Sequence, residues 1–321
     1  MLPQDLGRVV ETDVLIIGGG IAGLFAAIKA KEGNPGAKVT LVDKACPGAS
    51  GCSAFAAGVF LYCQPGDDTE PLVRQIVEDN AEYLIDQDYV RIAAAESYDR
   101  FRDLQEFGVE FLKDRRGQIT RVPALAAKTG LCSPFGGGPH LMWKMRAEAL
   151  KRGVVMFDRF MTTDLLTDNG GCIGAVGFGV RDGEFYIFKG RATVLAGGNL
   201  LFNAAPMGSS GGTGDGIAIA FRAGLELRNM EQLGNVSVGP KSLSAPGLHV
   251  IFGNGGILVN AQGERFMERY NPVLKEEARR FETARAILSE WREGRGPCYL
   301  DCTHLSPEAI ATIKRSLPLV M

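Results

Sequence analysis

The residues best suited to chemistry lie near the N-terminus, in Asp13–Ala27 (DVLIIGGGIAGLFAA). A short apolar run at 14–17, rich in β-branched residues, is typical of a strand buried on both faces. Glycines follow it, and apolar residues then recur at helical spacing. The turn and the first helical residues are Gly18, Gly19, Gly20, Ile21, Ala22 and Gly23. This order of strand, glycines and helix is the one that a phosphate-binding turn requires.

Each glycine of this turn has a physical task. Gly18 allows the sharp turn off the strand, Gly20 lets a pyrophosphate approach the backbone, and Gly23 lets the helix pack closely on the strand. The helix then directs its unpaired N–H groups and positive dipole end at the phosphates. A second strand, 38–42, ends at Asp43, 20 residues after Gly23, where a carboxylate can accept hydrogen bonds from an adenosine ribose. The pattern predicts a dinucleotide site and leaves NAD and FAD open.

A second glycine turn favours the larger of these cofactors. Gly211–Gly216 (GGTGDG) precedes a helix expected at 217–223. Two helix N-termini fed by glycine turns suit a large cofactor with several polar contacts. FAD is therefore favoured over NAD.

Composition excludes several other classes of function. The chain has 321 residues, 45% of them hydrophobic, and a net charge of −2. No basic groove for nucleic acid and no polybasic membrane anchor is expected from this balance. No apolar run approaches the roughly 20 residues that span a bilayer, and the N-terminus has no signal-peptide pattern. A cytoplasmic protein is expected, with membrane contact only through a partner. The seven cysteines are scattered, so no metal site is expected.

The order of predicted elements indicates an α/β fold. Strands expected at 163–166, 172–178 and 184–188 are separated by turn residues such as Asn169-Gly170 and are typical of an antiparallel insertion. A buried strand follows at Ala192–Ala196. A charged helix is expected over Lys275–Arg292. We predict a Rossmann-like FAD-binding domain over residues 1–230, with a parallel sheet and an antiparallel insertion, and an incomplete α+β capping domain over 231–321.

Several segments, in this order, resemble the flavoprotein subunits of succinate dehydrogenase and fumarate reductase, a family that includes L-aspartate oxidase and the adenylylsulfate reductase α subunit. The segments are GGGIAG, the small-residue loop after Asp43, ATVLAGG, GTGDGIAIAFRAGLELRNMEQ, ILVNAQGERFMERY and REGRGPCYLD. Gly263–Tyr270 (GERFMERY) is the most specific of them. FAD is what the resemblance implies.

The resemblance also implies the FAD contacts. Beyond the first glycine turn, they are carried over to Asp43, Lys44, Ser50, Gly51, Cys52, Ser53, Ala57, Gly58 and Asp215. Many members of the family bond the flavin covalently through a histidine in the small-residue loop, and Gly51 stands at that position. Non-covalent FAD is therefore expected. A thioether link through the neighbouring Cys52 is the alternative.

The resemblance places the catalytic arginine of the family at Arg285. The other interpretation is that Arg285 is one of several cations on a helix rich in arginine and glutamate. His249, in the expected cap, is a candidate acid or base. Residues that bind dicarboxylates in the family are missing: 235–239 reads NVSVG where His-Pro-Thr-Gly is expected, Leu248-His249 replaces Thr-Glu, and 253–256 reads GNGG in place of GEGG. Succinate and fumarate are therefore not the expected substrates.

The resemblance ends inside the cap, so either the chain is a piece of a longer protein or a second polypeptide completes it. The main hypothesis is a redox enzyme subunit that works beside an iron–sulfur partner on another small molecule, with an adenylylsulfate-reductase-like activity as one candidate. The second is a flavin-carrying electron-transfer or assembly subunit without substrate chemistry. A third, an NAD(P)-binding module, leaves the second glycine turn and the 263–270 motif unexplained.

Overall fold

The computed structural model describes residues 6–56, 60–81, 83–121, 130–200, 212–231 and 248–316, apart from the side chains of residues 79, 80, 248, 249, 280 and 316. The chain divides into two compact units, each built from separate stretches of sequence. The first consists of Met1–Phe55, Gly138–Ala204 and Gly208–Gly234, and the second of Ala56–Gly137, Ala205–Met207 and Asn235–Met321. The second unit thus takes in residues that lie before the predicted boundary at 230, and that boundary stays a prediction.

The first unit is built on a six-stranded sheet with the strand order β5-β2-β1-β8-β7-β6. Its strands are β1 (Arg8–Ile17), β2 (Val39–Val42), β5 (Val155–Phe157), β6 (Phe160–Asp168), β7 (Gly171–Gly179) and β8 (Phe185–Leu195). β1 runs parallel to β2 and β8, and β2 runs parallel to β5. β7 pairs antiparallel with β6 and β8. The predicted parallel sheet with an antiparallel insertion is confirmed.

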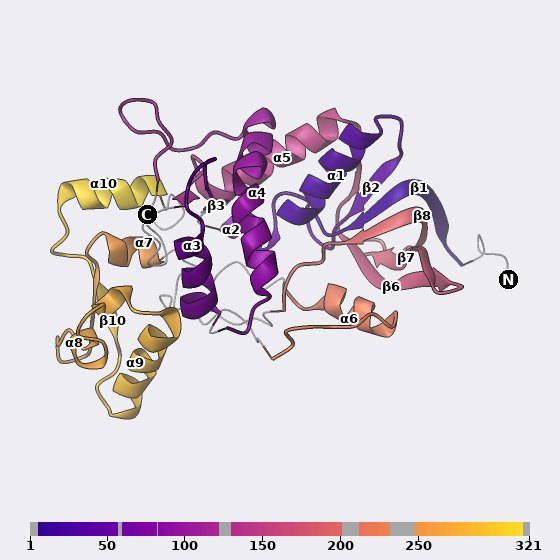
Figure 1. Ribbon diagram of the computed structural model, residues 1–321. Helices are drawn as coiled ribbons and strands as arrows, with labels where there is room; N and C mark the ends of the chain where they lie inside the picture. The colour runs from indigo at the N-terminus through magenta and orange to yellow at the C-terminus, as the bar shows by residue number, and fades with distance from the viewer. Residues whose placement is uncertain are drawn as a thin grey trace. The chain divides into compact units, whose positions relative to one another are not determined.

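Helices accompany this sheet because their apolar sides bury against it. α1 (Ile21–Gly33) packs on β1, β2 and β8, as Figure 1 shows for the indigo end of the chain. Its buried Leu24 and Ile28 complement the fully buried Ile16 of β1. α2 (Gly51–Phe55), α5 (Gly137–Lys151) and α6 (Asp215–Arg222) are the other helices here. A second cluster on the sheet, around Leu15 and Phe188, completes the core.

Two details of the insertion test the prediction from sequence. Asn169 and Gly170 both have positive φ, 47° and 78°, and they connect β6 to β7 as a two-residue hairpin of the kind that Asn-Gly favours. The expected strands at 184–188 and 192–196 are, however, one strand. β8 is continuous because β1 pairs with it from Tyr186 to Leu195, straight past Gly190.

The second unit is a mixture of helices and short antiparallel strand pairs. Its strands pair as β3 (Phe60–Leu61) with β4 (Leu131–Cys132), and β9 (Ile257–Val259) with β10 (Tyr299–Asp301). Its α-helices are α3 (Glu70–Gln75), α4 (Gln87–Glu106), α7 (Leu248–Gly253), α8 (Met267–Tyr270), α9 (Arg280–Arg292) and α10 (Pro307–Ser316), and it also has a short π-helix, η2 (Ile76–Asn80), and a short 3₁₀-helix, η3 (Lys275–Glu277). The predicted α+β character is confirmed.

The helix predicted over Lys275–Arg292 is wrong in its first turn. η3 ends at Glu277, Ala278 is extended with ψ 164°, and α9 begins at Arg280. At this interruption Glu276 is buried; it accepts a hydrogen bond from the N–H of Leu258 and forms an ion pair with Arg265.

Candidate functional site

The first glycine turn joins β1 to α1, at the carboxyl end of the parallel strands. Gly18 has a φ of 111°, and a methyl group there would overlap the carbonyl of Ala196. A methyl group on Gly23 would overlap the carbonyl oxygen of Gly18. Both positions therefore require glycine, for the turn and for the close packing that the sequence predicts.

Gly20 is different, because its surroundings are open. A methyl group there would meet only Ser53 Oγ, at 3.4 Å. In the described residues no hydrogen bond uses the backbone N–H of Gly20, Ala22 or Gly23, whereas that of Ile21 donates to Ser53 Oγ at 3.2 Å. The start of α1 thus offers free N–H donors beside an unfilled space, which is what a phosphate group requires.

Asp43 ties this turn to the next loop. Its Oδ2 accepts a hydrogen bond from the N–H of Gly19 at 2.6 Å, and its Oδ1 accepts one from the N–H of Ala45 at 2.7 Å. Each carboxylate oxygen has a second lone pair, so the predicted hydrogen bonds to a ribose are compatible with these contacts. Asp43 also shapes the turn itself, which the sequence did not reveal.

The small-residue loop after Asp43 is held in part by Ser50. Ser50 Oγ accepts from the N–H of Cys46 at 3.2 Å and donates to its carbonyl at 2.9 Å. Gly51 has a φ of 75° and free space where a side chain would start. Cys52 is exposed, with its sulfur 3.6 Å from Asn199 Oδ1. The predicted contacts at Ala57 and Gly58 lie outside the described residues.

The second glycine turn leads into α6. Gly214 has a φ of 76°, and a methyl group on Gly197 would lie 3.0 Å from the Cα of Gly216. This close approach seats the N-terminus of α6 against the residues that follow β8. Asp215, the first residue of α6, forms an ion pair with Lys44. Both predicted contact residues are thus brought together, although they are far apart in sequence.

The two turns fit a dinucleotide cofactor. They follow β1 and β8, which are adjacent and parallel, so both helix N-termini lie at the same edge of the sheet, where open α/β sheets bind ligands. The open space at Gly20 and the free N–H groups beside it suit the pyrophosphate of such a cofactor. FAD held there would supply a flavin ring that exchanges a hydride with a substrate.

The proposed catalytic residues belong to the other unit. Arg285 lies exposed on α9 and makes no hydrogen bond or ion pair within the described part of the chain. The buried face of α9 is formed by Thr283, Ala286 and Glu290. His249 lies in α7, and its side chain is outside the description. The roles of Arg285 and His249 stay predictions.

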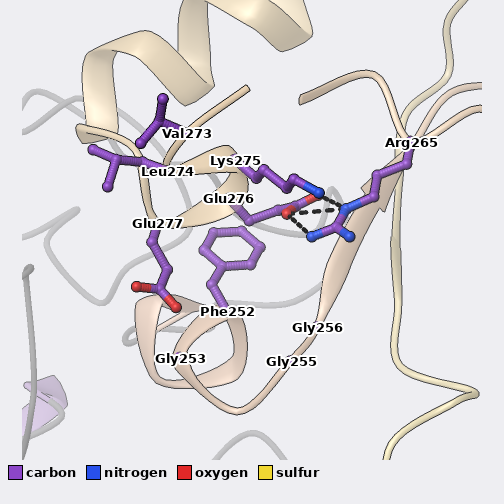
Figure 2. Close-up of a pocket in the computed structure, with 10 residues that line it drawn as sticks. All are labelled: Phe252, Gly253, Gly255, Gly256, Arg265, Val273, Leu274, Lys275, Glu276 and Glu277. Atoms are coloured by element: carbon purple, nitrogen blue, oxygen red, sulfur yellow. Dashed lines mark hydrogen bonds and ion pairs between the residues drawn. The ribbon is translucent and has the colours of Figure 1, made fainter. Parts of the chain in front are cut away.

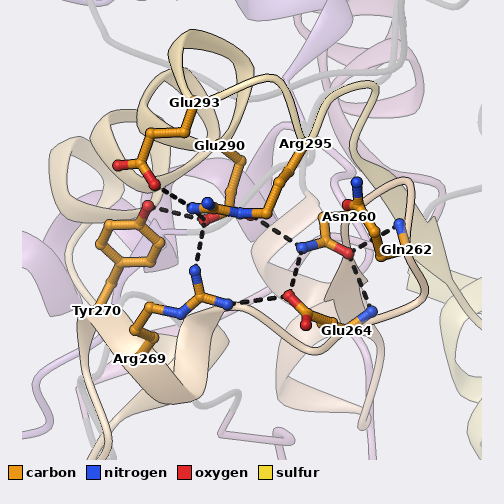
Figure 3. Close-up of polar contacts among 8 residues, drawn as sticks. All are labelled: Asn260, Gln262, Glu264, Arg269, Tyr270, Glu290, Glu293 and Arg295. Atoms are coloured by element: carbon orange, nitrogen blue, oxygen red, sulfur yellow. Dashed lines mark hydrogen bonds and ion pairs between the residues drawn. The ribbon is translucent and has the colours of Figure 1, made fainter.

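Sequence reasoning missed a buried polar cluster in the second unit, which Figure 3 shows. We call it the Glu290 cluster. Glu290 is 0% exposed and receives hydrogen bonds from Arg295 at 2.7 and 2.8 Å, Tyr270 Oη at 2.8 Å and Asn260 at 2.9 Å. These contacts, the one from Arg295 above all, lower the pKa of Glu290 to about 2 against the cost of burial. The cluster unites the GERFMERY and REGRG segments, which explains structurally why they occur together.

A second polar feature lines a cavity of about 390 Å³ in the same unit. Figure 2 shows Arg265 facing Glu276, which it contacts with both Nε and Nη2, the latter at 2.6 Å. The cavity lies beside Phe252 and the turn at Gly255 and Gly256. Because the guanidinium and the carboxylate neutralise each other, neither is free for a charged ligand.

Two properties of the described residues bear on the remaining predictions. No group of three or more His, Cys, Asp or Glu side chains among them could hold a metal ion. None of the helices in this described part is both long and apolar enough to cross a membrane.

Known proteins resemble this chain over most of its length. A family model described as FAD binding domain matches residues 13–315. One subunit of the fumarate reductase (CoM/CoB) of Methanothermobacter marburgensis is 35% identical over 94% of this chain and 57% of its own length. The succinate dehydrogenase flavoprotein subunit of Rickettsia bellii is 32% identical over 93% of this chain and 53% of its own length.

Solved structures give the same result. Quinol fumarate reductase of E. coli superimposes with a TM-score of 0.84 at 25% identity, covering 95% of this chain and 56% of that one. Adenylylsulfate reductase of Archaeoglobus fulgidus, at 23% identity and a TM-score of 0.64, shares the fold. This chain spans about half the length of the curated relatives it matches. The predicted resemblance and the FAD cofactor are confirmed: this chain belongs to the FAD-binding domain family that includes the flavoprotein subunits of fumarate reductase and succinate dehydrogenase.

Proposed function

We propose that this chain is the FAD-carrying part of an oxidoreductase that moves electrons between a small molecule and an iron–sulfur partner subunit. The observation that carries the proposal is the open N-terminus of α1, at the same edge of the sheet as the start of α6, in a member of an FAD-binding family.

The flavin is proposed to be bound without a covalent link. Gly51 has no side chain that could bond it, and Cys52 is the alternative attachment point. After acid precipitation of the purified protein, the yellow colour should remain in the supernatant and be identified as FAD. Colour in the pellet would contradict this expectation, and Cys52→Ser would then show whether the sulfur forms the link.

We propose a substrate other than a C4 dicarboxylate. Asn254 stands where the resemblance expects a glutamate, and its side-chain N–H donates to the carbonyl of Val250 at 2.7 Å. This amide therefore satisfies a backbone carbonyl in the last turn of α7. The other departures, at 235–239 and at the side chains of 248 and 249, lie outside the description. Fumarate and succinate are the natural controls, since relatives carry these names.

Arg285 is proposed to hold or deliver the proton of the reaction, and His249 is the second candidate. Arginine normally stays protonated, so it can give up a proton only in a desolvated setting that bound substrate would have to create. The exposed position of Arg285 and its lack of an ionic partner among the described residues leave its charge available to a substrate.

Replacing Arg285 with lysine should lower turnover at least about 100-fold with little change in FAD content, since the charge stays but the planar fork is lost. Turnover and flavin absorbance measured on the same preparations check this. Arg292→Lys, on the same helix and also exposed, is the matched control, and Arg280→Lys tests the neighbouring cation at the start of α9. Unaltered turnover in Arg285→Lys, with loss in Arg280→Lys, would assign the role to Arg280 instead.

A flavin carrier without substrate chemistry is the second candidate function, favoured by the use of Asn254 at the end of α7. The two functions differ in one measurement. The flavin is reduced chemically and then exposed to candidate oxidised substrates, and its absorbance is followed. Reoxidation by a small molecule supports the enzyme, and reoxidation by fumarate would refute the proposed substrate class. Reoxidation only by an iron–sulfur protein supports the carrier.

A further inference from the structure

One ion pair at the proposed FAD site joins the loop after β2 to the start of α6. Lys44 follows Asp43 at the end of β2, and Asp215 begins α6. Lys44 Nζ lies 2.5 Å from Asp215 Oδ2 and donates to Thr213 Oγ1 at 2.5 Å. The hydroxyl of Thr213 in turn donates to the same oxygen of Asp215 at 2.6 Å. Lys44 lies 169 residues before Thr213 and 171 residues before Asp215, so the three side chains join two loops that are far apart in sequence.

Asp215 poses an electrostatic problem for the site. A helix N-terminus attracts anions, but here a carboxylate already stands at it, and FAD carries a negatively charged pyrophosphate. Like charges that share a partly desolvated site repel one another. Burial raises the pKa of Asp215, but the hydrogen bonds from Lys44 and Thr213 outweigh it, and the pKa lies below its ordinary value. The carboxylate is therefore ionised at neutral pH.

The ammonium group of Lys44 lies where it can offset the negative charge of Asp215. The side chains of Lys44 and Asp215 are only 33% and 27% exposed, so solvent screens their attraction less than that of a surface pair. The ion pair also restrains α6 at the point where Gly214, at a φ of 76°, leaves the turn. The ion pair between Lys44 and Asp215 thus offsets the charge of the carboxylate and also restrains the start of α6.

We propose that Lys44 is the counter-ion of Asp215 within the FAD site: it cancels the carboxylate charge that would repel the dinucleotide, and it holds the N-terminus of α6 in place before FAD binds. This inference rests on the proposed function, because it takes FAD as the ligand. The rival explanation is that Lys44 serves the cofactor directly, without regard to Asp215.

A double-mutant cycle separates the two explanations. FAD affinity is measured by fluorescence titration of FAD-free protein for wild type, Lys44→Met, Asp215→Asn and the double variant. Lys44→Met should weaken binding about 10- to 100-fold, since it leaves a charged partner unpaired. Adding Asp215→Asn to Lys44→Met should then raise FAD affinity again by at least about fivefold, because the charge that repels the cofactor is gone. If Lys44 serves FAD directly, the double variant binds no better than Lys44→Met, and the inference is wrong.

Lys29→Met is the matched control. Lys29 pairs with Glu32 at 2.8 Å on α1 and is 35% exposed, so it has similar exposure but lies away from the site. It should leave FAD affinity unchanged. An equal loss in Lys29→Met would overturn the role given to Lys44.

Hydrogen exchange of FAD-free protein tests the positioning separately. Amides of Asp215–Arg222 should exchange faster in Lys44→Met than in wild type or Lys29→Met. Unchanged exchange there overturns the positioning of α6 by Lys44. If wild-type protein takes up no FAD at all, the proposed function fails, while the exchange comparison still decides whether Lys44 holds α6.

Discussion

Replacing Glu290 with alanine should destabilise the second unit by about 3–5 kcal/mol, because removing one partner of a buried ion pair leaves the other without compensation. Arg295, Tyr270 and Asn260 all direct donors at this carboxylate. Glu290→Gln, which keeps acceptor capacity without the charge, should cost about 1.5–3 kcal/mol. Urea unfolding, followed by circular dichroism, measures both variants.

Glu293→Ala is the matched control for this prediction. Glu293 contacts the same arginine, Arg295, but its side chain is 54% exposed, so its loss should cost less than about 1 kcal/mol. Equal destabilisation by Glu290→Ala and Glu293→Ala would show that the burial of Glu290 does not set its contribution to the free energy of unfolding.

The same carboxylate predicts how stability depends on pH. The pKa of Glu290 is about 2 in the folded protein against an ordinary 4.5. The folded state therefore favours the ionised form, so the stabilisation is complete above pH 4.5 and is lost as pH falls toward 2. Its full size is about 3 kcal/mol by linkage. Other carboxyl groups titrate in this range, so the difference between wild type and Glu290→Gln is the quantity to measure. A difference that does not narrow as pH falls would contradict the assignment.

The second large effect is expected at the first glycine turn. Replacing Gly23 with alanine should lower stability, whereas replacing Gly20 with alanine should weaken FAD binding. A methyl group at Gly23 would overlap the carbonyl of Gly18, so Gly23→Ala should cost about 3 kcal/mol or more by forcing α1 away from β1. Gly20→Ala meets no such clash. It should leave the stability of FAD-free protein within about 1 kcal/mol and weaken FAD binding about 100-fold, because the methyl group denies the cofactor its backbone N–H donors.

Thermal unfolding without FAD and titration with FAD distinguish these outcomes. Gly33→Ala serves as the control, since Gly33 ends α1 and a methyl group there has nothing within 4 Å. Gly33→Ala should change neither the stability of the FAD-free protein nor its affinity for FAD appreciably. Wild-type affinity in Gly20→Ala would mean that the open N–H groups of α1 do not face the cofactor.

Several features were determined by the sequence alone, because each depends on residues close together in the chain. The glycine turn at 18–23 was predicted from the change between strand and helix periodicity that surrounds it. The hairpin at Asn169-Gly170 was predicted because this pair readily adopts positive φ. The resemblance that implies FAD rests on motifs of the same local kind.

Other features were decided only by the tertiary structure, because they depend on partners far away in sequence. β8 is one strand because β1 supports it throughout. Glu276 is buried because Arg265 gives its charge a partner, and Glu290 is buried because Arg295 does the same. Hydrophobic periodicity reports where apolar side chains are buried, whereas a charged side chain is buried only where folding brings it a counter-charge. The meeting of Lys44 with Asp215 therefore became visible only in the folded chain.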